Sequence, residues 1–467
     1  MTFDEILKEV PNYKTFYTVD ELNDSSEQLA REFNRNVKLI RVGRSRKKED
    51  ILTLRIGSGK KKAVLFALPH PNEPIGAMTL EYFSRRLAED AELQKLDFTW
   101  YIVKCIDPDG TRLNEGWFKG PFTPLNVAMN FYRPPNYQQI EWTFPVDYKT
   151  LHWHKPLPET RALMRLIDEA KPAFLYSLHN SFFGGVYYYV GTHCRPLYPR
   201  FRRLVENENL PLHLGQPEAP FIKKLAPAVF KAFWVGENYD HQKKYTNKDP
   251  AKTLRMGASS WEYAMRVADT FSLIVEMPYW YDSRIADTSD SDVTQRDAIL
   301  HASDMALQRN KFIRQKYLEI RRKVRPSKDR KPFSDAVEYF TKSNIDYAIA
   351  DKNWAMSDHS LRRRASVAQK FDSYVAQESY SLFWLGMLYR YVKGTGNRSA
   401  ESEVLAQLQA WSGELNRQAS LRVIPIRSLV RVQLGSALLA CSYLQNAKTA
   451  KRGSRATHTQ RMMQERR

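Results

Sequence analysis

The sequence predicts an α/β domain that is followed by a smaller all-helical domain. Between residues 61 and about 277, apolar and β-branched runs of strand length alternate with segments of helical periodicity, which is typical of α/β folds. Beyond residue 331 only the helical periodicity remains. The chain has 467 residues, and at roughly 150 residues per domain this length favours two or three domains.

The first domain is expected to contain short apolar strands and amphipathic helices. Strands are expected at residues 63–68, 98–106, 174–178, 186–190 and 271–275. Helices are expected at residues 76–89 and 158–170, and the second of these begins with a proline. The tyrosine run at residues 187–189 is expected to pack within the sheet, and His152 and His154 are expected at the surface.

A basic segment at residues 311–331 separates the two predicted regions. It is dense in Arg and Lys, as a solvated helix face would be. After it, Val404, Leu408 and Leu415 share one helical face, and Pro425 precedes a last helix. We therefore predict a catalytic domain, a helical domain and a basic, disordered tail, at residues 1–325, 326–447 and 448–467.

Composition indicates a folded protein that is neither disordered nor embedded in a membrane. Hydrophobic residues make up 43% and charged residues 27%, close to globular averages. The longest nearly apolar stretch, residues 434–444, is shorter than the ~20 residues that a membrane helix needs. The first residues lack the basic and apolar regions of a secretory signal. Cys105, Cys194 and Cys441 are widely separated, as reduced thiols would be, so we expect a cytoplasmic protein.

Four residues that could bind a metal or act in catalysis follow predicted strands. His70 and Glu73 lie in the loop after the strand at 63–68, and His179 and Glu276 come at the ends of later strands. Imidazole and carboxylate groups suit zinc, and catalytic zinc commonly takes three protein ligands. A glutamate that ends an apolar strand is costly unless it faces a metal or a cleft. The pattern therefore predicts a zinc site at the strand ends.

These residues resemble the zinc carboxypeptidase family of carboxypeptidase A-like metallopeptidases, and in particular a bacterial-type cytoplasmic member. That family has a His-x-x-Glu pair, a distant third-ligand histidine and a late catalytic glutamate, and the likeness covers residues 41–281. Supporting motifs are Asp-Pro-Asp-Gly at 107–110, Thr-Arg-Leu-Asn at 111–114 and Pro-Glu-Thr-Arg-Ala at 158–162. The resemblance implies a mixed eight-stranded central sheet flanked by helices.

The resemblance also implies a role for each candidate residue. Three residues would bind one zinc ion, namely His70, Glu73 and His179. Glu276 would be the general base, and Arg112 would polarise the scissile carbonyl. Asn130 and Arg133 would bind the substrate's free carboxylate, although the family usually has these two residue types adjacent and here two residues separate them.

The expected activity is zinc-dependent hydrolysis of an amide bond next to a free carboxylate in a peptide or peptide-like substrate. Two alternatives remain open: an N-acyl amino acid deacylase with the same zinc triad, and a non-catalytic polyanion-binding or scaffold protein. The 72 Lys and Arg residues exceed the 52 Asp and Glu residues by 20, which suits an anionic partner or simple solubility. Binding to nucleic acid or to a membrane is not expected, and the oligomeric state is open.

Overall fold

A nine-stranded mixed β-sheet lies at the centre of the structure, a computed structural model that describes residues 3–464 and the side chains of residues 3–446. Its strand order is β1-β2-β4-β3-β7-β11-β8-β10-β9. In chain order these strands are β1 (Val37–Arg44), β2 (Asp50–Ile56), β3 (Lys61–Ala67), β4 (Phe98–Val103), β7 (Phe174–His179), β8 (Tyr187–Val190), β9 (Lys224–Ala226), β10 (Val229–Lys231) and β11 (Phe271–Glu276).

The middle of this sheet is parallel and buried on both faces. β4, β3, β7 and β11 run parallel to one another, whereas β8 is antiparallel to β11. Every residue of β7 and β11 is buried, as expected for strands that are covered on both sides. The register pairs Glu276 with His179 and with Tyr187, so these side chains stand side by side on one face of the sheet.

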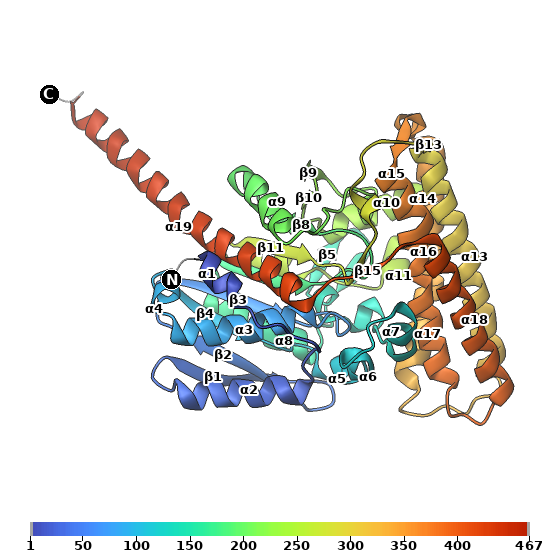
Figure 1. Cartoon of the computed structure of the whole chain (residues 1–467). Helices are drawn as coiled ribbons and strands as arrows, with labels where there is room; N and C mark the ends of the chain where they lie inside the picture. The colour runs from blue at the N-terminus through green and yellow to red at the C-terminus, as the bar shows by residue number, and fades with distance from the viewer. Residues whose placement is uncertain (1–2, 465–467) are drawn as a thin grey trace.

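Helices cover both faces of the sheet (Figure 1). Leu65 of β3 packs into the core beneath α2 (Val19–Glu32), α3 (Ile75–Glu89), α9 (Tyr198–Asn207) and α19 (Ile426–Gln464). Its neighbour Val64 packs into the opposite core with α8 (Pro158–Ala170), α10 (Val235–Tyr245) and α12 (Ser260–Val267). Successive strand residues thus enter different cores, as the period of two requires.

Four long helices form a separate layer at one end of the sheet (Figure 1). They are α13 (Gln295–Arg321), α14 (Lys331–Ser357), α17 (Ser381–Val392) and α18 (Arg398–Gln418). α17 packs closely on α7 (Pro124–Asn130), because a Cβ atom on Gly386 would overlap the Ala128 carbonyl group. Among the described residues, no helix combines the length and the apolar character that crossing a membrane requires.

Short elements join these layers. The remaining helices are α1 (Phe3–Lys8), α4 (Ala91–Gln94), α5 (Pro108–Arg112), α6 (Glu115–Phe118), α11 (Pro250–Leu254), α15 (Val367–Phe371) and α16 (Gln377–Ser379). Small two-stranded sheets pair β5 (Val146–Tyr148) with β6 (Leu151–Trp153), β12 (Trp280–Tyr281) with β15 (Arg422–Val423), and β13 (Asp290–Thr294) with β14 (Arg364–Ser366).

The structure confirms the predicted fold class, a mixed sheet with flanking helices and a C-terminal helical region, but the implied count of eight strands is wrong. The sheet has nine strands. β1 and β2 precede residue 61 and were not predicted, because β1 is only partly buried and lacks a continuous apolar run. β9 and β10 have three residues each, which is too short for a periodicity to be recognised.

The helical layer begins before the predicted boundary at residue 326, since α13 starts at Gln295 and packs along α14. α19 returns to the sheet of the first region and packs on α3. α19 runs to Gln464 and so extends into the tail predicted to be disordered, while residues 465–467 lie outside the described residues. The division into residues 1–325, 326–447 and 448–467 therefore stays a prediction about independent folding.

Gln433 connects α19 to the strand that carries His179. Its Nε2 donates to the carbonyl oxygens of His179, at 2.8 Å, and Val275, at 3.4 Å. Its Oε1 accepts a hydrogen bond of 2.9 Å from the Thr79 hydroxyl. The side chain is fully buried, so these contacts are shielded from water.

We expect Gln433→Leu to lower the free energy of unfolding by about 1–3 kcal/mol, because buried polar groups would lose their partner. Urea denaturation of the full chain measures this change. Gln409→Leu, at an exposed position of α18, is the matched control and should stay within about 0.5 kcal/mol of the parent. Equal stability of the two variants would contradict the role given to Gln433.

Candidate metal centre

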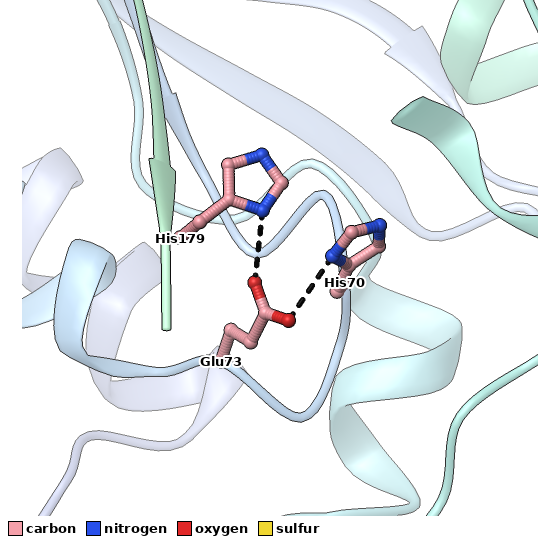
Figure 2. Close-up of side chains that lie close together, drawn as sticks. All are labelled: His70, Glu73 and His179. Carbon is pink, nitrogen blue, oxygen red and sulfur yellow. Dashed lines mark hydrogen bonds and ion pairs between the residues drawn. The ribbon is translucent and has the colours of Figure 1, made fainter. Parts of the chain in front are cut away.

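The three predicted metal ligands lie together in the structure. His70 Nδ1 is 3.0 Å from Glu73 Oε1, and His179 Nδ1 is 3.0 Å from Glu73 Oε2. Figure 2 shows both imidazole rings turned toward the carboxylate that lies between them. One donor atom from each residue lies within 4.8 Å of the other two. All three residues are buried, so the nitrogen and oxygen donors of the cluster are largely shielded from bulk water.

The ends of two parallel strands position this cluster. β3 ends at Ala67, and Leu68 adopts a φ of 58°, a left-handed conformation that turns the chain into the loop carrying His70 and Glu73. His179 is the last residue of the neighbouring β7. Because the carboxyl ends of parallel strands meet at the same edge, the loop and the strand end converge.

A chain of hydrogen bonds behind His179 fixes its orientation. His179 Nε2 donates to Ser177 Oγ at 2.8 Å, and Ser177 Oγ donates to Glu141 Oε2 at 2.9 Å. The Ser260 amide in turn donates to Glu141 Oε1 at 2.8 Å. The bond to Ser177 keeps Nε2 out of the cluster, so Nδ1 is the nitrogen that faces Glu73 and would bind a metal.

The charges at the cluster influence one another strongly. Burial, with Arg133 nearby, lowers the pKa of His70 to about 4. Burial also opposes the charge of His179, but Glu141 and Glu73 outweigh it and raise its pKa to about 10. Burial opposes ionisation of Glu73, yet the two histidines hold its pKa well below its usual range. The carboxylates of Glu73 and Glu141 thus stabilise positive charge at the cluster.

Glu276 lies beside the cluster without belonging to it. It ends β11 opposite His179, and its Oε1 is 4.0 Å from His179 Nδ1. Burial raises the pKa of Glu276 well above its usual range, against the opposing effect of His179 and with further help from Glu218. A carboxylate with a raised pKa that faces a cavity is suited to accept a proton from water.

A cavity of about 540 Å³ opens over these residues. Its floor carries the cluster and Glu276, and its walls include residues from the later helices, among them Arg309, Asn344, Tyr380 and Trp384. All residues predicted to bind the metal or to act in catalysis lie before residue 300, but residues of the helical layer complete the walls of the cavity around them. The volume suits a small molecule or a few residues of a peptide.

Of the two residues predicted to bind the substrate's carboxylate, the structure brings only Arg133 to the cavity. Arg133 lines it and donates from Nη1 to Glu73 Oε1 at 2.9 Å. Asn130 does not line it, because Asn130 is the last residue of α7 and its Nδ2 donates to the Asn126 carbonyl at 3.0 Å. The expected pair therefore reduces to one arginine.

Arg112 also lies outside the cavity, so its expected role in polarising the scissile carbonyl stays a prediction. It ends α5, and its guanidinium pairs with Glu49 at 3.0 Å and with Asp20 at 2.7 Å. These partners belong to the turn between β1 and β2 and to α2, elements that the sequence reading did not include. These ion pairs with distant segments turn the Arg112 side chain toward the surface, which its local motif does not indicate.

The residues of the cluster fit a zinc ion. Two imidazole nitrogens and a carboxylate form a common donor set of catalytic zinc, and tetrahedral bonds of about 2.1 Å would place donor atoms roughly 3.4 Å apart. The observed separations of 3.0 Å between each imidazole nitrogen and the carboxylate come close to this spacing. His70 Nδ1 faces Glu73 Oε1 and is therefore the nitrogen of His70 that the site engages, while the buried Nε2 has no hydrogen-bond partner.

Several residues of the site were not predicted from the sequence. Glu141 supports His179 and is fully buried, and its only local signal is a charge within an apolar segment. Glu218 and Tyr380 line the cavity from a proline-containing loop and from the junction of α16 and α17. Neither carries a recognisable motif.

Comparisons with known proteins agree with this geometry. The sequence profile described as zinc carboxypeptidase matches residues 22–281. Zinc carboxypeptidase A 1 of Anopheles gambiae is 24% identical over 294 residues, which cover 58% of this chain and 62% of that protein. The chain therefore spans about three fifths of the length of this curated relative.

Solved structures that align with part of this chain were also found. Carboxypeptidase A of Helicoverpa armigera aligns with 59% of this chain and 70% of its own, at 16% identity and a TM-score of 0.39. A metallo-carboxypeptidase of Burkholderia cenocepacia aligns with 56% of this chain and 60% of its own, at 14% identity and a TM-score of 0.33.

Proposed function

Since this chain belongs to the zinc carboxypeptidase family, we propose that it hydrolyses an amide bond next to a free carboxylate in a peptide or peptide-like substrate. The observation that carries the proposal is the buried cluster of His70, Glu73 and His179 with Glu276 beside it on a neighbouring strand. The histidine and glutamate cluster binds a metal, and Glu276 supplies a base to the same cavity.

Each residue has a defined task in this reaction. His70, Glu73 and His179 hold zinc, which when bound supplies a Lewis acid for the scissile carbonyl and acidifies water. Glu276 takes a proton from the attacking water and returns it to the leaving amine nitrogen. The cavity walls orient the substrate and limit the water around it, which strengthens each electrostatic contact.

Arg133 is the residue suited to bind the substrate's free carboxylate, because it lines the cavity and its guanidinium can form paired hydrogen bonds. We expect Arg133→Gln to lower kcat/KM by about 10- to 100-fold, since hydrogen bonds to charged groups contribute about 1.5–3 kcal/mol. Steady-state kinetics with a carboxylate substrate and its amidated counterpart measure the effect.

The amidated substrate separates carboxylate binding from other roles of Arg133, because the variant should lose far less on it than on the free acid. Arg112→Gln is the matched control, since its surface pairs lie outside the cavity. A loss at Arg112 equal to that at Arg133 would be inconsistent with this assignment.

A substrate screen tests the proposal as a whole. Purified protein with zinc should release C-terminal amino acids from short N-acylated peptides, and a chelator should abolish the release. Cleavage of N-acyl amino acids with peptides left intact would favour the deacylase instead. Stoichiometric zinc with no amide hydrolysis on either panel would contradict the proposed function.

A further inference from the structure

Glu218 is an anchored carboxylate in the active-site cavity. Tyr187 donates a short hydrogen bond to Glu218 Oε1, and Tyr189 donates to Oε2 at 3.0 Å. Both tyrosines are buried on β8, and the register pairs Tyr187 with Glu276. Prolines 217 and 220 flank the loop position and restrict its backbone. Glu218 is therefore held in place on the side of Glu276 away from His179.

Glu218 has no cationic partner, unlike other carboxylates that line the cavity. Glu378 pairs with Arg309 at 3.2 Å and with His301 at 2.8 Å, and Asp351 pairs with His241 at 3.2 Å. Among the described residues, no Lys, Arg or His nitrogen lies within ion-pair distance of Glu218. Its negative charge is left facing the cavity that it lines.

A second carboxylate reaches the same cavity from the helical region. Asp372 is buried and begins a π-helical turn at Asp372–Ala376. It accepts a 3.1 Å hydrogen bond from the backbone N–H of Gln216, in the loop that carries Glu218. Its nearest basic group is His213, whose Nε2 is 4.0 Å away and donates to the Gln216 carbonyl at 2.8 Å. Asp372 therefore has no lysine or arginine to neutralise it.

Polar atoms around Asp372 also lack partners. The Ser373 hydroxyl, on a residue that is 1% exposed, has no hydrogen-bond partner, and neither has the Gln216 Nε2 atom. Both residues line the cavity. Buried polar groups are nearly always satisfied in native proteins. The unpaired Ser373 hydroxyl can accept a hydrogen bond from a cationic group. Beside two carboxylates that have no Lys or Arg partner, it indicates a place where a ligand supplies the missing bond.

We propose that Glu218 and Asp372 form a subsite for a positively charged group of the substrate, an ammonium or a guanidinium. The inference rests on the proposed function, because it places the cationic group on the same substrate whose amide bond is hydrolysed. Asp372 is buried and Glu218 is exposed at the cavity wall, and two carboxylates that line one cavity attract a cation more strongly than either does alone. The enzyme thus selects amide substrates that carry a basic residue.

Two positions on the substrate could carry that charge, and paired substrates distinguish them. Benzoyl-Ala-Lys and benzoyl-Ala-norleucine differ only in the ammonium group of the released residue. Benzoyl-Lys-Ala and benzoyl-norleucine-Ala differ in the same way on the acyl side. We expect kcat/KM for the lysine member of one pair to exceed that of its norleucine partner by about 10- to 100-fold, the range of a hydrogen-bonded charge pair.

Glu218→Gln removes the charge and keeps the side-chain shape. The lysine-to-norleucine ratio should fall toward unity in this variant, and Asp372→Asn should lower it in the same direction. Glu206→Gln, at an exposed position of α9 outside the cavity, is the matched control and should keep the parent ratio. Calorimetry with free lysine and norleucine gives a second measurement that does not depend on turnover.

The outcomes separate the subsite from the proposed function. Equal rates for both members of each pair, with equal binding of lysine and norleucine, would overturn the subsite while leaving amide hydrolysis intact. Selective lysine binding that Glu218→Gln abolishes, without hydrolysis of any substrate, would support the subsite and contradict the proposed function. A preference that persists unchanged in both carboxylate variants would also overturn the assignment.

Discussion

Replacing Glu276 with glutamine should lower kcat by about 100- to 10,000-fold, the usual contribution of a general base. Glutamine keeps the size of the side chain but cannot take a proton from water. Glu276 contacts the metal cluster only at 4.0 Å through His179, so zinc content should remain stoichiometric. Steady-state kinetics and metal analysis of the same preparation measure both quantities.

Glu206→Gln is a suitable control here as well, because its carboxylate pairs with Arg202 on the surface of α9. That variant should retain full activity. Near-normal turnover of Glu276→Gln would exclude Glu276 as the base, and loss of zinc from it would show that Glu276 is a ligand.

Substitution of His179 by alanine should remove nearly all bound zinc and, with it, hydrolysis. Loss of a residue that only supports a metal ligand commonly lowers metal affinity by 10- to 100-fold, and loss of a ligand should exceed that range. The measurement is zinc per chain after dialysis, together with amide hydrolysis at saturating substrate.

His152→Ala is the matched control, because this histidine is exposed and bonds only to Asp147 among the described residues. It should keep one zinc per chain. Retention of stoichiometric zinc by His179→Ala would refute the ligand assignment, while weakened binding that excess zinc restores would show that His70 and Glu73 hold the ion alone.

The strand ends were predictable because strong local signals mark them. His179 and Glu276 each follow a run that is apolar except for one serine, and in adjacent parallel strands such positions meet at one edge. The helix at 158–170 was predicted with its observed bounds, since proline favours the first helical position and the apolar face repeats regularly. For these elements local pattern and tertiary structure agree.

The residues that the sequence did not reveal, or that lie elsewhere than expected, depend on contacts between distant segments. Arg112 turns away from the cavity because Asp20 and Glu49, from elements far apart in sequence, attract its guanidinium. Glu218 lies in a loop whose position is set by Tyr187 and Tyr189 and not by its own sequence. The helical wall of the cavity likewise follows from packing that no periodicity encodes.

The docking of α19 constrains the order in which a newly synthesised chain can mature. Leu434 and Leu438 of α19 are buried in the core shared with β3, β7 and β11, and Gln433 holds the carbonyl group of His179. β11 leaves the ribosome about 150 residues before this helix does, a delay of roughly 8–30 s at 5–20 residues per second. During that interval the part of the sheet that α19 covers is exposed to chaperones and to aggregation. The hydrogen bond from Gln433 to the His179 carbonyl has also not yet formed.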